Sequence, residues 1–297
     1  RFKINFMKIL DGKKVSEDIK NEIKILVDQL KLKNKRPPHL AAILVGSDGA
    51  SLTYVSSKVK ACNQVGFKSS LFRFDDQISE KELLNHIENL NLDKEIDGFI
   101  VQLPLPKQID EEKVLLSINP EKDVDGFHPS NFGRMALEMD SFIPATPHGI
   151  VELLERYKIN TKGKHCVVLG RSQIVGRPIS ILMSQKIKSG NATVTLAHSQ
   201  TKNLENLTKT ADIIISALGI PEFIKPHMVK KSSVIIDVGV TRVKDSSNKK
   251  GYTIKGDVDF DKVSPICSYI TPVPGGVGPM TIAMLLKNTL RARSLSS

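Results

Sequence analysis

The sequence predicts an α/β protein with two domains, each built on a parallel sheet covered by helices. Short apolar runs that indicate buried strands alternate along the 297 residues with segments of helical periodicity. A stretch interrupted by prolines, residues 142–157, divides these elements into two series. The second series opens with a glycine-containing turn between a strand and a helix. We therefore expect two α/β domains of ordinary size.

The first series predicts a βαβαβ unit. Apolar residues recur at helical spacing from Val15 to Leu30, which predicts an amphipathic helix. Ser79 and Glu82 form a capping box at the start of a later helix. The remaining elements are strands at 39–46, 68–74 and 97–106 and helices at 51–66 and 79–90.

A second α/β series follows the interruption. Pro144 and Pro147 break the chain, and Thr146 is placed to cap the helix after them. We expect the last helix to return to the first domain, which would make that domain discontinuous. The expected strands lie at 164–170, 192–197, 212–219 and 233–240, and the expected domains are 7–146 with 278–297, and 147–277.

Composition argues against several protein classes. No run of about 18 apolar residues predicts a transmembrane helix. The first residues lack the apolar region and cleavage site of a secretory signal, and Met7 is a candidate natural start. Three distant cysteines without a C-x-x-C pair argue against structural zinc and a disulfide framework, so we expect a cytoplasmic protein. These cysteines are Cys62, Cys166 and Cys267.

The formal net charge is +11, which leaves nucleic-acid binding as one interpretation. The lysines are scattered, however, and the one dense run spans residues 31–36. No zinc-finger or RNP pattern is present. Solvated lysines are the simpler explanation, and a polyanionic small substrate or a phosphorylated cofactor is an intermediate one.

The turn at 167–178 follows a buried strand and opens a helix, as dinucleotide-binding turns do. Gly170 and Gly176 are present, but Ser172 and Val175 stand at the second and third glycine positions. The helix N-terminus would offer N–H groups to a pyrophosphate. By glycine spacing alone, an ordinary strand–turn–helix explains the segment equally well.

The end of the next strand favours NADP over NAD. Enzymes that use NAD usually place an acid there for the ribose diol, whereas this chain has His198 and Ser199. Arg171 and Arg177 lie in the preceding turn, so a 2′-phosphate would meet cations and a hydroxyl. Arg177 as an exposed helix residue and His198 as a loop residue remain the alternatives.

Five polar residues of the first series are considered as candidate site residues. Tyr54 and Lys58 are four apart on one helix face, where a solvated lysine and a partly buried tyrosine are the common case. Buried beside a ligand, Lys58 would instead carry protons. Gln102 ends an apolar strand at the carboxyl edge of the sheet. Of Asp123 and Asp125, one would cap the turn and the other would bind a ring with adjacent N–H groups.

No further acids support metal ligation by these two aspartates, so no metal site is predicted. A rigid loop with few side chains follows the last strand and favours contact between its backbone and a flat ligand. Its eight residues contain three prolines and three glycines, namely Pro272, Pro274, Gly275, Gly276, Gly278 and Pro279.

Together, these motifs resemble the family of bifunctional methylenetetrahydrofolate dehydrogenases/methenyltetrahydrofolate cyclohydrolases. The resemblance covers about residues 7–290, and Val240 stands where many members have isoleucine. The matching segments, in the family's order, are YVSSKVKAC, GFIVQLPLP, PEKDVDGFHPSN, ATPHGIVELL, GRSQIVGRP, DVGV, GDVDF and ITPVPGGVGPMT.

The resemblance implies two reactions at one site, oxidation of 5,10-methylenetetrahydrofolate by NADP and hydrolysis of the methenyl product to 10-formyltetrahydrofolate. It implies that Tyr54 stacks on the folate, that Lys58 carries the proton and that Gln102 holds Lys58. Asp125 would accept hydrogen bonds from the pterin. The implied substrate-binding residues also include Leu103, Pro272, Gly275 and Gly276, and the cofactor-binding residues are Gly170, Arg171, Ser172, Ser199 and Val240.

The resemblance further implies a folate domain and a Rossmann-like NADP domain on either side of an active-site cleft. It implies a homodimer whose basic surface suits a folate with or without a polyglutamate tail, and no nucleic-acid or membrane partner. Another NADP oxidoreductase with the same second domain, and a basic RNA-binding α/β protein, are the alternatives. The first does not explain Tyr54, Lys58 and Gln102 together, and the second rests on the charge alone.

Overall fold

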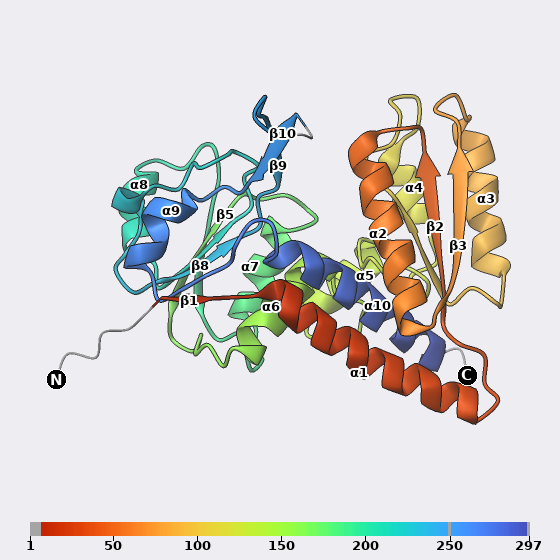
Figure 1. Cartoon of the computed structure of the whole chain (residues 1–297). Helices are drawn as coiled ribbons and strands as arrows, with labels where there is room; N and C mark the ends of the chain where they lie inside the picture. The colour runs from red at the N-terminus through yellow and green to blue at the C-terminus, as the bar shows by residue number, and fades with distance from the viewer. Residues whose placement is uncertain (1–6, 249–250, 296–297) are drawn as a thin grey trace. The chain divides into compact units, whose positions relative to one another are not determined.

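The computed structural model describes residues 7–248 and 251–295, and they form two compact units (Figure 1). Unit 1 consists of residues 7–15 and Thr146–Thr281. Unit 2 consists of Ser16–Ala145 and residues 282–295. The segment RFKINF and residues 296–297 lie outside the described residues.

Unit 2 contains a three-stranded parallel sheet with the order β3-β2-β4, which confirms the predicted parallel pairing. Its central strand β2 is buried along its whole length, because helices cover both faces of the sheet. The strands are β2 (His39–Val45), β3 (Lys68–Phe74) and β4 (Gly98–Val101). The helices are α1 (Gly12–Leu32), α2 (Gly49–Val65), α3 (Glu80–Leu92), α4 (Glu111–Ser117) and α5 (Pro129–Ala136).

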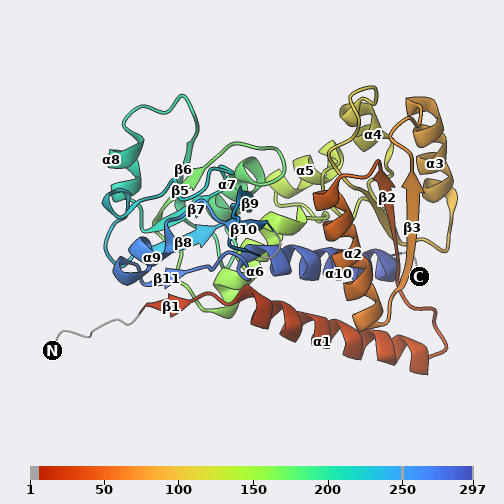
Figure 2. The same cartoon turned by 45° about the horizontal axis from the view of Figure 1, so that its top comes forward.

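Alternation along β2 separates two apolar layers. Ile43 packs with Ile87 of α3, Phe99 of β4 and Val114 of α4 in one buried cluster. Helix α2 lies on the opposite face of the sheet (Figures 1 and 2). Helix α2 starts just after the carboxyl end of β2, and one of its sides faces the solvent.

Local signals in the sequence set the helix ends of unit 2. Asp48 accepts a hydrogen bond from the backbone N–H of Ser51 and caps α2, and Gly66 ends this helix in a left-handed conformation at φ 81°. Ser79 and Glu82 form the predicted capping box of α3. These bonds fix where the candidate site helix α2 begins and ends.

Unit 1 contains a six-stranded parallel sheet with the order β1-β11-β8-β7-β5-β6. The chain passes from β5 to β6 on one side and then to β7 on the other, which creates a topological switch point beside β5. The strands are β1 (Lys8–Ile9), β5 (His165–Leu169), β6 (Thr193–Ala197), β7 (Ile213–Ser216), β8 (Val234–Asp237) and β11 (Tyr269–Ile270). The helices are α6 (Ala145–Arg156), α7 (Gly176–Ser184), α8 (Leu204–Lys209) and α9 (Phe260–Val263).

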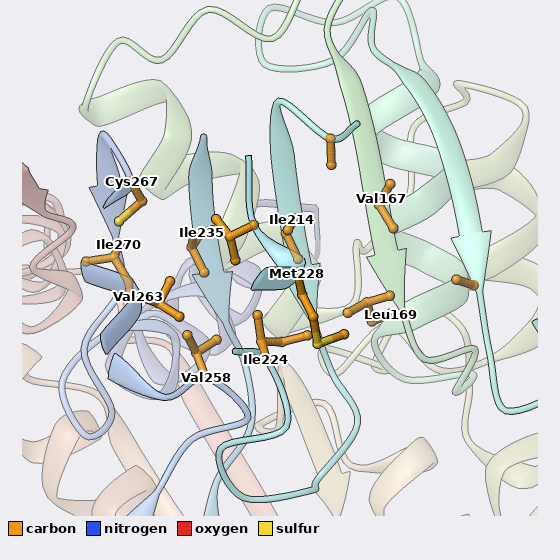
Figure 3. Close-up of a cluster of buried hydrophobic side chains, with 13 residues drawn as sticks. Val167, Leu169, Ile214, Ile224, Met228, Ile235, Val258, Val263, Cys267 and Ile270 are labelled. Atoms are coloured by element: carbon orange, nitrogen blue, oxygen red, sulfur yellow. The ribbon is translucent and has the colours of Figure 1, made fainter. Parts of the chain in front are cut away.

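One buried apolar cluster of unit 1 lies on one face of this sheet (Figure 3). Val167 of β5, Ile214 of β7 and Ile235 of β8 are fully buried there and meet Met228 and Val258 from the connecting segments. Strands buried on both faces carry continuous apolar runs, as β7 and β8 do. The described residues contain no helix that is long and apolar enough to cross a membrane.

The N-terminal strand differs from the expected domain boundaries. Strand β1 pairs with β11, and the backbone N–H groups of Lys8 and Leu10 donate to the carbonyls of Ser268 and Ile270. Residues 7–15 therefore belong to unit 1, whereas the expected first domain was 7–146. A two-residue strand is too short to show alternation in the sequence.

The last helix, α10 (Val277–Leu295), crosses the division between the units, which falls after Thr281. In unit 2, the Asn288 amide donates to the carbonyls of Val124 and Ile143 at 2.9 and 3.0 Å. An antiparallel hairpin of β9 (Thr241–Lys244) and β10 (Tyr252–Lys255) was not predicted.

The expected capping role of Thr146 is wrong. Thr146 is the second residue of α6, and its hydroxyl forms a 2.9 Å hydrogen bond with the hydroxyl of Thr281 on α10. A Cβ atom on Gly149 would lie 2.8 Å from the Cβ atom of Met280, so α6 and α10 approach closely at this glycine. Packing between the two helices, rather than a cap, fixes the start of α6.

Two helical glycines should respond oppositely to alanine. A Cβ atom on Gly133 in α5 would have nothing within 4 Å, so Gly133→Ala should raise the free energy of unfolding by about 0.5–1 kcal/mol. Gly149→Ala should lower it by roughly 1–3 kcal/mol because the methyl group overpacks the contact with Met280. Urea unfolding of both variants measures the difference. A stabilised Gly149→Ala protein would contradict the close packing of α6 and α10.

Candidate functional site

The site residues of unit 2 gather where α2 passes the end of β4. Tyr54 and Lys58 lie one turn apart on α2, and the Tyr54 side chain is 46% exposed. Lys58 Nζ donates to Gln102 Oε1 at 3.3 Å. The structure thus brings together two predicted site residues that are 44 positions apart in the sequence.

The Gln102 amide is held from both ends. Its backbone N–H continues the sheet by donating to the Ile43 carbonyl at 2.9 Å. Its side-chain Nε2 donates to the Leu103 carbonyl at 2.8 Å, which leaves Oε1 as the atom that faces Lys58. Gln102 follows the last residue of β4, at the carboxyl edge of a parallel sheet where ligand sites are common.

Asp123 is the residue that holds the turn after β4. Its buried carboxylate accepts hydrogen bonds from the backbone N–H groups of Gly126, Phe127 and His128 at 3.1, 3.3 and 2.8 Å. It also accepts one from the side chain of Asn131 at 2.9 Å. Of the two predicted roles in this turn, Asp123 therefore has the structural one.

Asp125 is left with a different environment. The described residues give its carboxylate no hydrogen-bond donor and no ion pair at bonding distance. Burial raises the pKa of Asp125, and repulsion from Asp123 adds to this, while the positive charge of Lys58 lowers it. Asp125 thus lies within the field of Lys58, as a carboxylate available to an external donor.

The glycine turn of unit 1 is built around Gly170 and Gly176. Gly170 has a φ of 103°, and a Cβ atom there would lie 2.3 Å from the Ala217 carbonyl oxygen. A Cβ atom on Gly176, the first residue of α7, would lie 2.0 Å from the Gly170 oxygen. Both glycines are required for the close approach of strand, turn and helix.

Ser172 occupies backbone N–H groups at the start of α7 that were expected to be free. Its hydroxyl accepts from the N–H groups of Val175 and Gly176 at 3.2 and 3.3 Å, and its carbonyl accepts from Arg177. These first-turn N–H groups are therefore not free, contrary to the expectation from the helix N-terminus. Within the described residues, no bond uses the backbone N–H groups of residues 172–174, so these donors remain available to a pyrophosphate.

The predicted 2′-phosphate residues are accessible. Arg171 and Ser199 are exposed, and neither side chain has a hydrogen bond or ion pair within the described parts of the chain. The backbone after β6 turns through His198, whose N–H donates to the Thr201 hydroxyl at 2.9 Å. This turn contains no carboxylate that would repel a phosphate.

The proline- and glycine-rich loop of unit 1 has structural reasons for two of its glycines. Gly275 has a φ of 109°, and its carbonyl accepts from the Lys13 N–H at 2.8 Å. A Cβ atom on Gly276 would lie 2.6 Å from the Pro272 oxygen. Gly278, by contrast, has open space around it. Glycine at positions 275 and 276 is therefore weaker support for ligand contact than the sequence indicated.

Two buried aspartates without a predicted role organise the loops around Val240. Asp237 accepts from the N–H groups of Gly239, Asp257 and Val258 at 2.9 to 3.0 Å. Burial raises the pKa of Asp237 to about 7, while the bonds from Asp257 and Val258 oppose the rise. The signal was present in the segments DVGV and GDVDF, where an aspartate ends or precedes a buried turn.

Asp257 holds the other side of this network. Its carboxylate accepts from the Ser216 hydroxyl at 3.0 Å and from the N–H groups of Leu218 and Ile220 at 2.7 and 3.0 Å. Val240 stands on the loop so formed and is 48% exposed. Across 7–248 and 251–295, no three His, Cys, Asp or Glu side chains form a group that could hold a metal ion.

Two family models match the chain. The model described as the catalytic domain of tetrahydrofolate dehydrogenase/cyclohydrolase matches residues 10–125. The model described as the NAD(P)-binding domain of the same enzyme matches residues 144–297. Together they cover most of the sequence, in the order of the two α/β series.

Similar proteins and structures agree with these matches. Bifunctional protein FolD of Flavobacterium johnsoniae is 66% identical over 291 residues, which cover 98% of this chain and 99% of that protein. The crystal structure of the Campylobacter jejuni bifunctional enzyme FolD is 46% identical, with a TM-score of 0.91 and coverage of 97% and 99%. The Trypanosoma brucei FolD structure, complexed with NADP and an inhibitor, is 36% identical, with a TM-score of 0.92 and coverage of 98% and 99%.

The two aspartates of the turn should differ in their effect on stability. Asp123→Ala removes the acceptor of four hydrogen bonds and leaves the N–H groups of Phe127 and His128 without any, so it should lower the free energy of unfolding by roughly 2–4 kcal/mol. Asp125→Asn removes a half-buried, desolvated charge that has no donor within the described residues, and it should leave stability unchanged or raise it.

The sign of the pH effect follows from the raised pKa of Asp125. A carboxyl group whose pKa is higher in the folded state lowers the free energy of unfolding of the protein as the pH rises from the group's unfolded pKa to its folded pKa. The gain from Asp125→Asn should therefore be larger at neutral pH than at acidic pH. Urea unfolding at both pH values checks this, and an equal effect at both would show that Asp125 is not desolvated.

Proposed function

Because the chain belongs to the tetrahydrofolate dehydrogenase/cyclohydrolase family, we propose which of its residues bind the folate, move the proton and hold the cofactor. The enzyme oxidises 5,10-methylenetetrahydrofolate to 5,10-methenyltetrahydrofolate with NADP, and it hydrolyses this product to 10-formyltetrahydrofolate. The two steps need different help from the protein. Oxidation needs the folate to be aligned with the nicotinamide of NADP, whereas hydrolysis also needs a proton carrier.

Lys58 is the proposed proton carrier, and its hydrogen bond to Gln102 is the observation that supports this role most directly. In hydrolysis, water adds to the cationic methenyl carbon and loses a proton, and one carbon–nitrogen bond breaks as a ring nitrogen gains a proton. Lys58, starting as the neutral amine, takes the first proton, and the ammonium group so formed supplies the second. Gln102 fixes the ammonium group without adding a charge, because its oxygen is the only part of the amide turned to Lys58.

Tyr54 and Asp125 are the proposed folate-binding residues beside Lys58. The exposed ring of Tyr54 offers a face for stacking one helical turn from the amine. The carboxylate of Asp125 suits the adjacent N–H groups of a pterin, which would supply the donors it lacks within the chain. The backbone of Leu103, already positioned by Gln102, adds a further contact.

Residues of unit 1 are proposed to hold NADP. The close approach at Gly170 and the available N–H groups of Ser172 and its neighbours fit a pyrophosphate, because a side chain at either glycine would block the turn. Exposed Arg171 and Ser199 fit a 2′-phosphate. When bound, NADP accepts the hydride from the folate. Val240 contributes an apolar contact to the cofactor.

The loop with Pro272, Gly275 and Gly276 is proposed to contact the folate through its backbone. Gly275 is held in a left-handed conformation, so the local chain is fixed before any ligand arrives. Close packing within the loop already explains why glycine stands at positions 275 and 276. The backbone contact with the folate therefore rests on the rigidity of the loop.

Assembly and location are likewise proposals. We expect a homodimer in the cytosol, with a folate substrate whose glutamate tail suits the net charge of +11. The reducing compartment is supported by Cys62, Cys166 and Cys267, which are buried free thiols. Burial raises the pKa of Cys62 and Cys166 to about 12 and that of Cys267 to about 11, so all three remain protonated.

Lys58→Met should abolish most of the hydrolysis of the methenyl compound while leaving folate binding largely intact. Loss of a positioned proton carrier typically costs about 10²- to 10⁴-fold in rate. The measurement is the decay of methenyl absorbance under single-substrate conditions, with a folate dissociation constant for the same protein. Lys60→Met, which removes an exposed lysine from the same helix, is the matched control. Near-normal hydrolysis by a folded Lys58→Met protein would reject the role.

Combined replacement of Arg171 and Ser199 by alanine should raise the Michaelis constant for NADP by roughly 10- to 100-fold, because charge-assisted bonds to the 2′-phosphate are lost. The constant for NAD, which lacks this phosphate, should change little. Arg177→Ala serves as the comparison, since Arg177 is an exposed residue of the same helix start. Equal losses with both cofactors would assign Arg171 and Ser199 to the pyrophosphate or the fold.

A further inference from the structure

A second pocket lies in unit 1, at the edge where the strands of the six-stranded sheet begin. Lys164 precedes β5, Asp212 precedes β7, Ser233 precedes β8 and Ser268 precedes β11, and all four line the pocket. These strands are parallel, so their starts share one edge. The glycine turn at Gly170 follows the carboxyl end of β5 and therefore lies at the opposite edge. The pocket has a volume of about 250 Å³.

The lining of this pocket is positively charged. Its one acid is Asp212, whose Oδ1 accepts from Lys230 Nζ at 2.7 Å. This hydrogen bond lowers the pKa of Asp212 despite its partial burial, so the carboxylate is ionised and already paired. Within the described residues, the other three lining lysines have no carboxylate at ion-pair distance, and these are Lys158, Lys164 and Lys231.

Neutral donors accompany the lysines. Ser233 is 2% exposed, and its buried hydroxyl has no hydrogen-bond partner in the described structure. A buried hydroxyl without a partner costs about 1–3 kcal/mol, which an acceptor supplied by a ligand would offset. Asn160 also lines the pocket, and its Oδ1 already accepts from the Lys162 N–H at 3.2 Å, so its amide group can donate.

Ordinary solvation of surface lysines explains part of the positive charge around the pocket. Lys158 follows the end of α6, where a cation compensates the negative end of the helix. That explanation does not account for the hydroxyl of Ser233, a residue that lines the same pocket, which is buried without a partner in the described structure. It also does not account for three unpaired lysines around one small concave site.

The chemistry of these groups selects the ligand. Lysines bind phosphate as point charges, and a hydroxyl or amide donor adds direction. The volume is below the roughly 300–1,000 Å³ of ordinary small-molecule sites, so a dinucleotide does not fit. We propose that this pocket binds a small phosphate anion of the size of pyrophosphate, at the edge of the sheet opposite to the cofactor turn.

The test is calorimetric titration of inorganic pyrophosphate into the protein saturated with NADP, at constant ionic strength. Saturation occupies the dinucleotide turn, so the remaining heat reports the second pocket. The expected result is one bound anion. Replacement of both Lys158 and Lys231 by glutamine should weaken binding by about 100-fold, or roughly tenfold for each lost charge-assisted bond.

Ser233→Ala separates binding from folding. Its hydroxyl has no partner to lose, so the melting temperature should be unchanged or higher, while pyrophosphate binding should weaken by about tenfold. Lys209→Gln, which removes an exposed lysine of α8 outside the pocket, should bind pyrophosphate like the unmodified protein. A nucleoside diphosphate should bind no more tightly than pyrophosphate, because the pocket has no room for a base and ribose.

Four results would overturn the proposal. One is the absence of binding to the NADP-saturated protein. The second is a loss as large in Lys209→Gln as in the double lysine variant, which would indicate a general effect of charge. The third is unchanged binding in both the Ser233 and the double lysine variants. The fourth is a nucleoside diphosphate that binds more than tenfold more tightly, which would assign the pocket to a nucleotide.

Discussion

Buried carboxylates that accept hydrogen bonds from backbone N–H groups hold the loops that carry the proposed site residues of this protein. Asp123 does so in unit 2, and Asp237 and Asp257 do so in unit 1. Each accepts at least two backbone donors and so replaces the hydrogen bonds that a loop lacks when it leaves a sheet. A charged acceptor makes these bonds stronger than amide–carbonyl bonds. The loops at the carboxyl edges of both sheets are thereby fixed without any ligand.

A second carboxylate of the same turn takes no part in this scaffold. Asp125 is two residues from Asp123 in the same turn, yet the turn uses only Asp123. Desolvation of Asp125 is unfavourable within the folded chain, and the field of Lys58 only partly compensates. Lys58 in turn is held by a neutral amide rather than by a carboxylate, so its charge remains available to a substrate. Within the described residues, the structure therefore combines a rigid turn with one carboxylate that has no hydrogen-bond donor, a combination typical of a binding site.

The sequence predicted the fold well where the signals were periodic or local. The parallel strands of both sheets, the capping box of Ser79 and the stop at Gly66 follow from apolar runs, caps and glycine. It failed where a partner distant in sequence decides the structure. Strand β1 exists because β11 pairs with it, and the hydroxyl of Thr146 bonds to Thr281 instead of capping a helix.

The same distinction applies to the site. The spacing of Tyr54 and Lys58 indicated a shared helix face, but only the fold brings Gln102 to Lys58. Which of two neighbouring aspartates holds the turn depends on the direction of the backbone N–H groups, and spacing does not encode that direction.

The pairing of β1 with β11, and of Asn288 with the carbonyls of Val124 and Ile143, has a further consequence for biosynthesis. Each unit needs residues from both halves of the polypeptide, so neither can reach its final hydrogen bonding while the ribosome still holds the last helix. The three strands of unit 2 lie within residues 39–101 and can pair early, but the bonds of Asn288 and the pairing of β1 with β11 must wait for the C-terminal part of the chain.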